Sequence, residues 1–349
     1  MFLAETVSSG PDHAQTRFVR LDMGQVRDHG RDVRTVISTL DELASRGPVP
    51  FEALFMAHYR SIRALARLDV AGAGVIAVHA PTGLLAGRLW VARHEDRANA
   101  GIVGRHSVCD LVLDDPRISL RHLAFVLPAG DRHRDRFSLH ELRTSRGLVG
   151  ELGQPMGGAH VEGAGLFRIG PFALFAFNTG TPERWPELAS DAWRDLSGRT
   201  QGLRVVRPDP ERQRPIARPA RTPSVTAIRG PMRTNEILLS PGGVRACTLS
   251  LASGPRRQRL ALGEAALERG VLLGRYSRCD SGDVLSSKNI SRIHLLVLRV
   301  DDDLLAIDTA SSHGVFRADD DQTLARVVRL DAGEIAVLGD GDASVRLAK

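Results

Sequence analysis

The chain repeats one unusual pattern of residues, and this repeat constrains its fold more than any other feature of the sequence. The segment from Gly101 reads GIVGRHSVCDLVLDDPRISLRHLAFVL, and the segment from Gly270 reads GVLLGRYSRCDSGDVLSSKNISRIHLLVLRV. In both, a Gly-Arg pair precedes a Cys-Asp pair, and a Ser-x-x-His motif then precedes an apolar run. A repeat of this length predicts two copies of one domain, with Arg105 equivalent to Arg275.

The similarity between the two copies continues beyond these segments. Each is followed by a turn that contains glycine, ELRTSRGL in the first copy and DTASSHGV in the second. Short apolar runs separated by turn residues surround both, and this spacing is typical of an all-β sandwich or barrel. The aligned pairs include Gly104 and Gly274, Cys109 and Cys279, Asp110 and Asp280, Ser119 and Ser291, His122 and His294, and Gly147 and Gly314.

The sequence divides the chain into four parts. Apolar residues recur with helical spacing from Val33 to Leu43 and from Phe51 to Leu65, so we expect residues 1–67 to form a small α-helical N-terminal extension. Residues 68–178 and 236–349 contain the two β-rich copies. Residues 179–235 are rich in Pro and Arg, which predicts a linker with one short helix in PERWPELASDAWRDL.

Composition narrows the class of protein. A chain of 349 residues suffices for two or three domains, and its balance of apolar and charged residues is typical of a soluble globular protein. Neither a signal peptide nor a membrane-spanning run is recognisable, so we expect no membrane insertion.

The three cysteines form no CxxC pair, which favours a reducing cytoplasm. The net charge of +6 favours acidic partners, but nucleic-acid binding is not expected, because the positive charge is mostly arginine spread along the chain.

Some short motifs resemble those of enzymes, but the other residues that such an enzyme site requires are missing. Residues 133–135 read HRD, as in protein kinases, but His140 replaces the asparagine that should follow, and no glycine-rich loop or DFG triplet is present. GVLLGR lacks the Gly-Lys-Ser/Thr ending of a phosphate-binding P-loop. The histidines and cysteines have no metal-ligand spacing, and no Ser–His–Asp or carboxylate pair stands out. We therefore expect no metal, no cofactor and no enzymatic activity.

The ordered set of Gly-Arg, Cys-Asp, Ser-x-x-His and a serine-containing turn that ends in glycine resembles the forkhead-associated (FHA) domain. The resemblance covers most of the chain outside the N-terminal helices and the linker. It implies a mainly β protein with two FHA-type β-sandwich domains of about eleven strands each. It also implies that loops at one end of a sandwich bind phosphothreonine in a partner protein, without catalysis.

The chemistry of phosphate supports this interpretation for the second copy. A phosphorylated side chain carries almost two negative charges, so its capture in water needs an arginine fork and neutral donors in fixed positions. The resemblance implies that Arg275 and Ser291 are the primary phosphate ligands, with Arg292 in support. Ser312 and His313 lie in the turn that grips the peptide backbone, and a neutral histidine donates and accepts as the usual asparagine does. The structural residues implied are Gly274, His294 and Gly314.

The first copy departs further from the pattern. Arg105 and Ser119 are in place, but leucine follows the serine, and Arg146 stands after Ser145 where asparagine or histidine is usual. Arginine donates to a peptide carbonyl but does not accept from a peptide N–H, which weakens backbone gripping. The basic residues that could enlarge this cluster are Arg117, Arg121 and Arg146, and the structural residues implied are Gly104, His122 and Gly147.

These observations lead to the hypothesis of a non-catalytic, cytoplasmic adaptor that binds a threonine-phosphorylated protein, such as a Ser/Thr kinase or its substrate, mainly through the second copy. The alternative is a phosphate-independent scaffold subunit of a signalling or secretion assembly, in which the helical N-terminus and the first copy form a constant interface. The sequence leaves open the oligomeric state, and also whether the two copies pack together.

Overall fold

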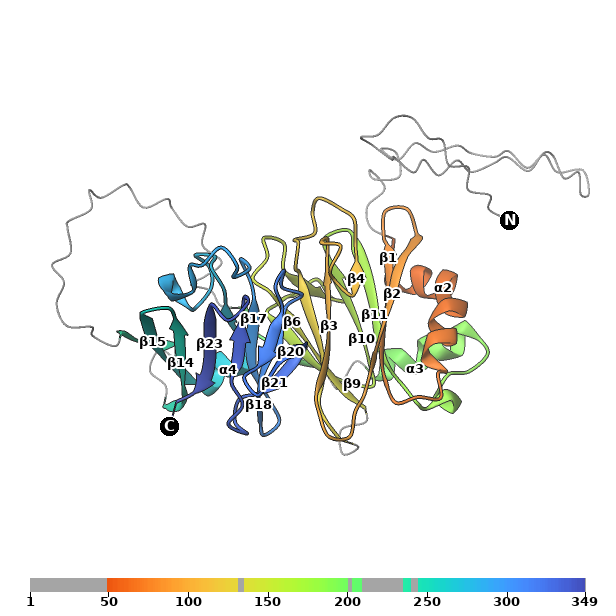
Figure 1. Cartoon of the computed structure of the whole chain (residues 1–349). Coiled ribbons are helices and arrows are strands. Elements are labelled where there is room, and N and C mark those ends of the chain that lie inside the picture. The colour runs from red at the N-terminus through yellow and green to blue at the C-terminus, as the bar shows by residue number, and fades with distance from the viewer. Residues whose placement is uncertain (1–48, 131–134, 200–202, 209–234, 240–243, 349) are drawn as a thin grey trace, which may run out of the picture. The chain divides into compact units, whose positions relative to one another are not determined.

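The computed structural model describes residues 49–130, 135–199, 203–208, 235–239 and 244–348, which fall within one unit of the chain, Pro48–Lys349. These residues are mainly β, as predicted, and their strands form two sandwiches (Figure 1). The helix predicted between Val33 and Leu43 lies outside the described residues. Of the helices in the described ranges, none is long and apolar enough to cross a membrane.

The first sandwich consists of β1–β11 with β12 added at one edge. Its sheets have the orders β2-β1-β11-β10-β7-β8 and β12-β9-β6-β5-β3-β4. Alternate side chains of both sheets, among them Val75, Phe125 and Leu174, meet in one buried core, as the period of two in a strand requires. The strands are β1 Gly72–His79, β2 Leu84–Ala92, β3 Asn99–Gly104, β4 Leu111–Val112, β5 Leu123–Leu127, β6 Arg136–Glu141, β7 Leu148–Gly150, β8 Pro155–Met156, β9 Gly158–Glu162, β10 Ala164–Ile169, β11 Phe172–Thr179 and β12 Arg204–Val206.

The second sandwich is built in the same way from β13–β23. Its sheets have the orders β13-β15-β14-β23-β22-β19-β20 and β16-β17-β18-β21, and Leu251, Val297 and Leu338 belong to its core. The strands are β13 Asn235–Leu239, β14 Arg245–Ser253, β15 Arg256–Gly263, β16 Val271–Leu273, β17 Leu295–Val300, β18 Asp303–Asp308, β19 Val315–Arg317, β20 Asp320–Leu324, β21 Val327–Arg329, β22 Ala336–Leu338 and β23 Ala343–Leu347, with α4 (Glu264–Arg269) and the 3-10 turn η4 (Gly282–Leu285) between them.

Two helices cover the outer face of the sheet that contains β1, β10 and β11 (Figure 1). The first, α2 (Phe51–Ala66), confirms the helix predicted there, and its predicted apolar face is buried at Phe51, Leu54, Phe55 and Ile62. The second, α3 (Ala189–Arg199), lies where the sequence predicts a short helix. Its Trp193 ring lies 5.2 Å from the ring of Phe55.

Part of the expected linker folds onto the first sandwich. Besides α3, the 3-10 turn η2 (Pro182–Arg184) belongs to this part, and β12 pairs antiparallel with β9. Trp185 and Leu196 are buried in the cluster that contains α2. Burial of these apolar side chains stabilises the packing, so residues 182–199 and 203–206 of the expected linker belong to the folded first sandwich.

The two sandwiches also share an apolar layer. β5 is buried at every position, and β17 at all but one. One set of side chains on each strand faces its own core, while the other set packs across, with Ala124 and Val126 of β5 in one cluster with Leu296 and Leu298 of β17. Strands buried on both faces have such unbroken apolar runs. The sheets that contain β5 and β17 therefore form an interface between the sandwiches.

Candidate functional site

Three loops of the second sandwich lie together at the ends of β16, β17 and β18. They are the arginine loop (residues 275–280), the serine loop (291–294) and the glycine turn (309–314), and each contains residues that the sequence analysis singles out. The equivalent loops of the first sandwich are residues 105–110, 119–122 and 142–147. Matching hydrogen bonds hold both sets, so the two ends have the same backbone design.

A glycine brings the arginine loop against the serine loop. At Gly274 a Cβ atom would lie 2.4 Å from the carbonyl oxygen of Arg292, so no other residue fits there without a shift of the backbone. The N–H of Arg275 then donates to the carbonyl of Ser291 at 3.1 Å, and the N–H of Tyr276 donates to the carbonyl of Arg292 at 3.0 Å. The two predicted phosphate ligands thus belong to loops that are joined residue by residue.

A buried histidine ties the serine loop to the glycine turn. The backbone N–H of Ser291 donates to Nδ1 of His294 at 3.0 Å, and Nε2 lies 2.9 Å from the carbonyl oxygen of Gly314. Burial lowers the pKa of His294, so the ring is neutral, with its proton on Nε2 for donation to Gly314. Gly314 has a φ of 74°, a conformation that glycine adopts without strain.

The serine hydroxyl lies against the glycine turn. The N–H of Ser312 donates to Oγ of Ser291 at 3.0 Å, and the two Oγ atoms are 3.5 Å apart. The hydroxyl of Ser291 is therefore held at the place where the three loops meet, although the two serines are 21 residues apart in the sequence.

Solvent reaches the basic side chains around this hydroxyl. Arg275, Arg292 and His313 are exposed, and Nε2 of His313 lies 3.9 Å from a carboxylate oxygen of Asp340. Among the residues that the structure describes, no carboxylate forms an ion pair with Arg275. Its guanidinium is thus available to an anion from outside.

The first sandwich repeats the framework but differs in its side chains. The N–H of Ser119 donates to Nδ1 of His122 at 3.2 Å, and Nε2 of this buried histidine lies 3.1 Å from the carbonyl oxygen of Gly147. Arg105 bends towards the serine loop, because its Nε donates to the carbonyl of Ile118 at 3.2 Å. Ser145 and Arg146 are exposed in the glycine turn.

Two arginines of the basic cluster that the sequence predicts for the first sandwich have partners within the protein. Arg117 forms an ion pair of 2.8 Å with Asp115, and the hydrogen bonds from Arg117 hold the pKa of this carboxyl below its ordinary value. Arg121 is only 8 % exposed, and its guanidinium donates to the backbone carbonyls of Thr309 and Ala310 in the second sandwich. The assignment of Arg121 to a phosphate site is therefore wrong.

The alignment of the two copies already indicated that Arg121 faces the other sandwich. Arg121 is equivalent to Ile293, the residue directly before the histidine of the second serine loop, and Ile293 packs against the apolar layer between the sandwiches. The position thus faces the other sandwich in both copies. The sequence analysis also missed Arg143, whose guanidinium pairs with Asp280 across the same interface.

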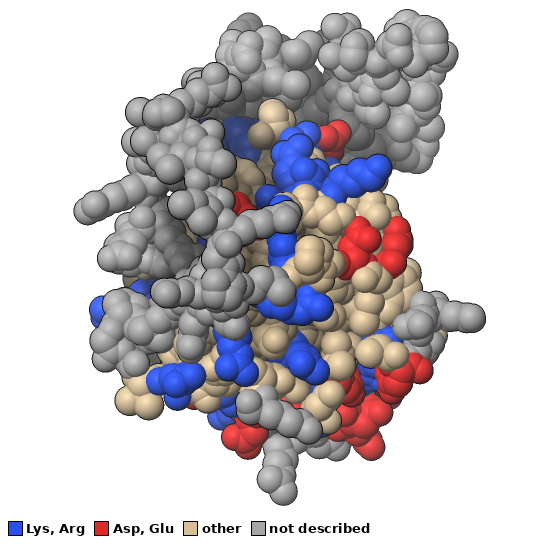
Figure 2. All heavy atoms as spheres, turned by 60° about the vertical axis from the view of Figure 1, so that its left-hand side comes forward, with Lys and Arg blue, Asp and Glu red and all other residues tan. Residues whose placement is uncertain are grey.

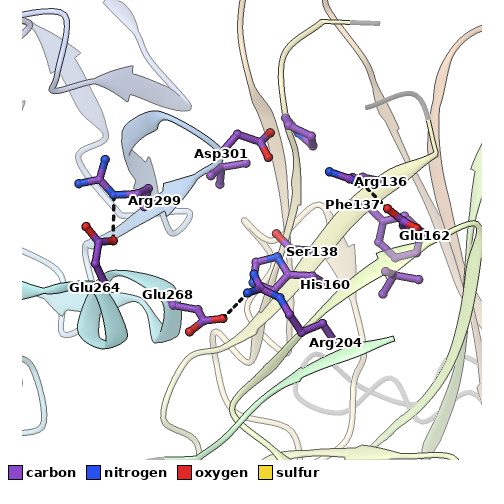
Figure 3. Close-up of a pocket in the computed structure, with 13 residues that line it drawn as sticks. Arg136, Phe137, Ser138, His160, Glu162, Arg204, Glu264, Glu268, Arg299 and Asp301 are labelled. Carbon is purple, nitrogen blue, oxygen red and sulfur yellow. Dashed lines mark hydrogen bonds and ion pairs between the residues drawn. The ribbon is translucent and has the colours of Figure 1, made fainter. Parts of the chain in front are cut away.

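A cavity of about 600 Å³ lies away from these loops, between β6 and β9 of the first sandwich and α4 and β17 of the second (Figure 3). Three ion pairs line it: Arg204 with Glu268 at 2.9 Å, Arg299 with Glu264 at 3.3 Å, and Arg136 with Glu162 at 2.5 Å. No predicted ligand lines the cavity, and within the described ranges no group of three or more His, Cys, Asp or Glu side chains could hold a metal ion. The candidate site is thus confined to the loops.

One outer sheet face of the second sandwich is basic. In β14, Ser250 pairs with Arg259 of β15 on one side and with Arg346 of β23 on the other, and Arg257 follows on the same face. These arginines are exposed, and Figure 2 shows Lys and Arg gathered over the middle of this side of the molecule. Such a face attracts acidic partners and accelerates their encounter with the protein.

Comparison with known proteins identifies one of the two sandwiches directly. The family model of the FHA domain matches residues 101–151, which run from β3 to the turn after β7. The matched range contains Gly104, Arg105, Ser119, His122 and Gly147. An FHA domain is thus present in the first sandwich, the copy that departs further from the expected pattern. A search of curated proteins gave no match.

Several solved structures that are similar to part of this chain are described as FHA domains. The FHA domain of CT664 from Chlamydia trachomatis is 17% identical and covers 30% of this chain and 96% of its own, with a TM-score of 0.25. FHA-1 of Rv1747 from Mycobacterium tuberculosis is 22% identical and covers 30% and 98%, with a TM-score of 0.24. A structure described as part of an analysis of phosphothreonine-dependent FHA domain interactions is 19% identical and covers 29% and 98%, with a TM-score of 0.22.

Proposed function

We propose that this chain is a non-catalytic adaptor that binds phosphothreonine peptides in Ser/Thr-kinase signalling, mainly through its second sandwich. FHA domains belong to the modules that recognise phosphorylated motifs with arginine clusters. The match of the FHA family model to the first sandwich supports a phosphothreonine peptide as the class of ligand. The second sandwich repeats the same backbone hydrogen bonds, which supports the proposal that it is a second domain of the same type.

One observation carries the proposal. The hydroxyl of Ser291 is held at 3.0 Å from the N–H of Ser312, on a loop that His294 and the backbone of Arg275 fix from two sides. A phosphate bound there would meet this hydroxyl, and the exposed side chain of Arg275 on the adjoining loop would supply the guanidinium fork. Charge-assisted hydrogen bonds of this kind are about twice as strong as neutral ones.

The side chains favour the second sandwich over the first. Arg292 follows the serine and is exposed, whereas Leu120 follows Ser119 and contributes no charge. In the glycine turn, a neutral His313 can both donate to and accept from a peptide backbone, while Arg146 can only donate. We therefore propose the second sandwich as the main site and the first as a weaker one.

The proposed partner is a threonine-phosphorylated protein, either a Ser/Thr kinase or one of its substrates. The basic face with Arg257, Arg259 and Arg346 would favour acidic residues in that partner. We place the protein in the cytoplasm, where its three cysteines would remain free thiols, as they are in the structure.

Calorimetry of the full-length protein with phosphothreonine peptides from a library screen tests the proposal. We expect Arg275→Ala to weaken binding by about 10- to 100-fold, because a hydrogen bond to a charged group contributes about 1.5–3 kcal/mol. Arg245→Ala removes another exposed arginine of the same sandwich, at the start of β14 and outside the residues assigned to binding, and serves as the matched control. We expect Arg105→Ala to have a smaller effect than Arg275→Ala.

Two results would contradict the proposal. Equal binding of the unphosphorylated peptide would exclude phosphate recognition and favour the phosphate-independent scaffold. A larger loss with Arg105→Ala than with Arg275→Ala would move the main site to the first sandwich.

A further inference from the structure

We infer that the two sandwiches form one rigid receptor for a single peptide that carries two phosphothreonines, with Arg121 and Arg143 holding the two sets of loops in a fixed arrangement. This inference rests on the proposed function and specifies its ligand. It follows from where the contacts between the sandwiches lie.

The apolar layer makes the arrangement rigid. Side chains of the first sandwich, among them Ile102 and Val126, lie in one buried cluster with side chains of the second, among them Leu272, Leu296 and Ile307. Buried apolar side chains from two sheets pack at the density of a protein interior. The sandwiches are therefore expected to move as one body.

Arg121 connects the serine loop of the first sandwich to the glycine turn of the second. Its Nε donates to the carbonyl of Thr309 at 2.7 Å and to that of Ala310 at 3.0 Å. Ser119 comes two residues before Arg121, and Ser312 comes two residues after Ala310. A phosphate ligand of one site is thus connected to the peptide-gripping turn of the other through one buried guanidinium.

Arg143 makes the converse connection, from the glycine turn of the first sandwich to the arginine loop of the second. Its guanidinium pairs with the buried carboxylate of Asp280 and donates to the carbonyl of Arg278 at 2.9 Å. In the opposite direction, Arg326 of the second sandwich pairs with Asp110 in the arginine loop of the first at 3.2 Å. The contacts therefore join the ligand-binding loops themselves, which brings both candidate sites to the same end of the pair.

A fixed arrangement has a measurable consequence for ligands. Two sites on a flexible tether tolerate many ligand lengths, whereas two fixed sites favour the length that matches their separation. Each peptide residue adds at most about 3.4 Å of reach, so the distance between two phosphothreonines can be varied in small steps.

The test uses the full-length protein and synthetic peptides with two phosphothreonines separated by about 4 to 24 residues of Gly and Ser, compared with singly phosphorylated peptides of equal length. We expect the affinity to pass through a maximum at one narrow range of spacing, about 100-fold or more above that of either single phosphopeptide, with one peptide bound per chain.

Interface variants show whether the loop contacts set this preference. We expect Arg143→Gln and Arg121→Gln to broaden or abolish the spacing optimum while single phosphopeptides still bind. Arg136→Gln removes an arginine of β6 that pairs with Glu162 of β9, away from the loops, and serves as the matched control. A general loss of fold would also lower single-site binding, so the spacing profile separates a positioning role from a structural one.

The outcomes separate this inference from the proposed function. If single phosphopeptides bind but the second phosphothreonine adds nothing at any spacing, the inference is wrong and the proposed function stands. A gain that is equal at all spacings would show that the sites move independently and would also overturn the inference. If no phosphopeptide binds, the proposed function itself fails.

Discussion

Neutral histidines have structural roles in both sandwiches. His122 and His294 each accept a hydrogen bond from the serine loop at Nδ1 and lie with Nε2 near a carbonyl of the glycine turn. Burial lowers the pKa of both rings, which keeps Nδ1 free of a proton. A protonated ring could no longer accept at Nδ1, so the geometry of each candidate site depends on neutral imidazole.

His140 makes the stability of the protein depend on pH. The ring is fully buried on β6, and burial, with a smaller contribution from His160, lowers its pKa to about 3. Above pH 6.5 the ring is neutral in both states and contributes nothing. Below that value the unfolded chain binds a proton that the folded protein excludes, so the free energy of unfolding falls by up to about 1.4 kcal/mol per pH unit until pH 3.

We therefore expect His140→Leu to unfold at a urea concentration that depends less on pH between 6.5 and 4.5 than that of the wild type. His94→Leu, at a partly exposed histidine, is the control. Urea midpoints measured across this range check the prediction, and parallel pH profiles for the wild type and His140→Leu would refute it. Some dependence should remain in the variant, because the pKa values of His122 and His294 are also lowered.

Among the elements, α2 shows how an added helix becomes part of a β-sandwich. Its apolar side chains recur on one face, and that face packs on the outer side of the sheet that contains β1 and β11. Aromatic rings dominate the contact, with Phe55 lying 5.3 Å from Tyr59 and 5.8 Å from Phe175 between ring centres. The helix therefore covers an apolar sheet face that would otherwise be exposed to water.

Truncation of this contact should be costly. Phe55 is fully buried, so we expect Phe55→Ala to lower the free energy of unfolding by about 3–5 kcal/mol, through lost burial and the cavity that remains. Arg60→Ala changes an exposed residue of the same helix, and we expect a change within about 0.5 kcal/mol. Urea denaturation of the full chain measures both, and equal stabilities would show that α2 contributes little to the fold.

In the whole chain, the interface between the sandwiches should determine how cooperatively the protein unfolds. The apolar layer and the arginine contacts join the two cores, so we expect one transition for both. Ala124 is fully buried in the layer, and Ala124→Arg would place an unpaired charge there, at a cost of several kcal/mol. The variant should relieve this cost by separation of the sandwiches, not by loss of either core.

Differential scanning calorimetry checks this prediction. We expect a single transition for the wild type, two transitions for Ala124→Arg, and a single one for the control Ala86→Arg, which adds the same charge at an exposed position of β2. Two transitions in the wild type would contradict the cooperative interface.

Local sequence patterns carried most of the information about the fold. Short apolar runs separated by turn residues predicted the β class, the repeat predicted two similar units, and the spacing from Phe51 predicted α2. The framework of each candidate site was also readable, because Gly274 and His294 satisfy short-range demands of a close backbone approach and of loop hydrogen bonds. These backbone contacts form between adjacent loops of one sandwich, so short sequence motifs are enough to predict them.

The roles of Arg121 and Arg143 were not readable in this way. Near a proposed phosphate site, the local sequence around an exposed arginine does not differ from that around an arginine whose side chain contacts another domain. Arg121 meets its partner Thr309 at a separation of 188 residues, and only the packing of two complete sheets creates that contact. The folding of residues 182–199 and 203–206 onto the first sandwich has the same cause, because burial of Trp185 and Leu196 depends on surfaces that distant segments supply.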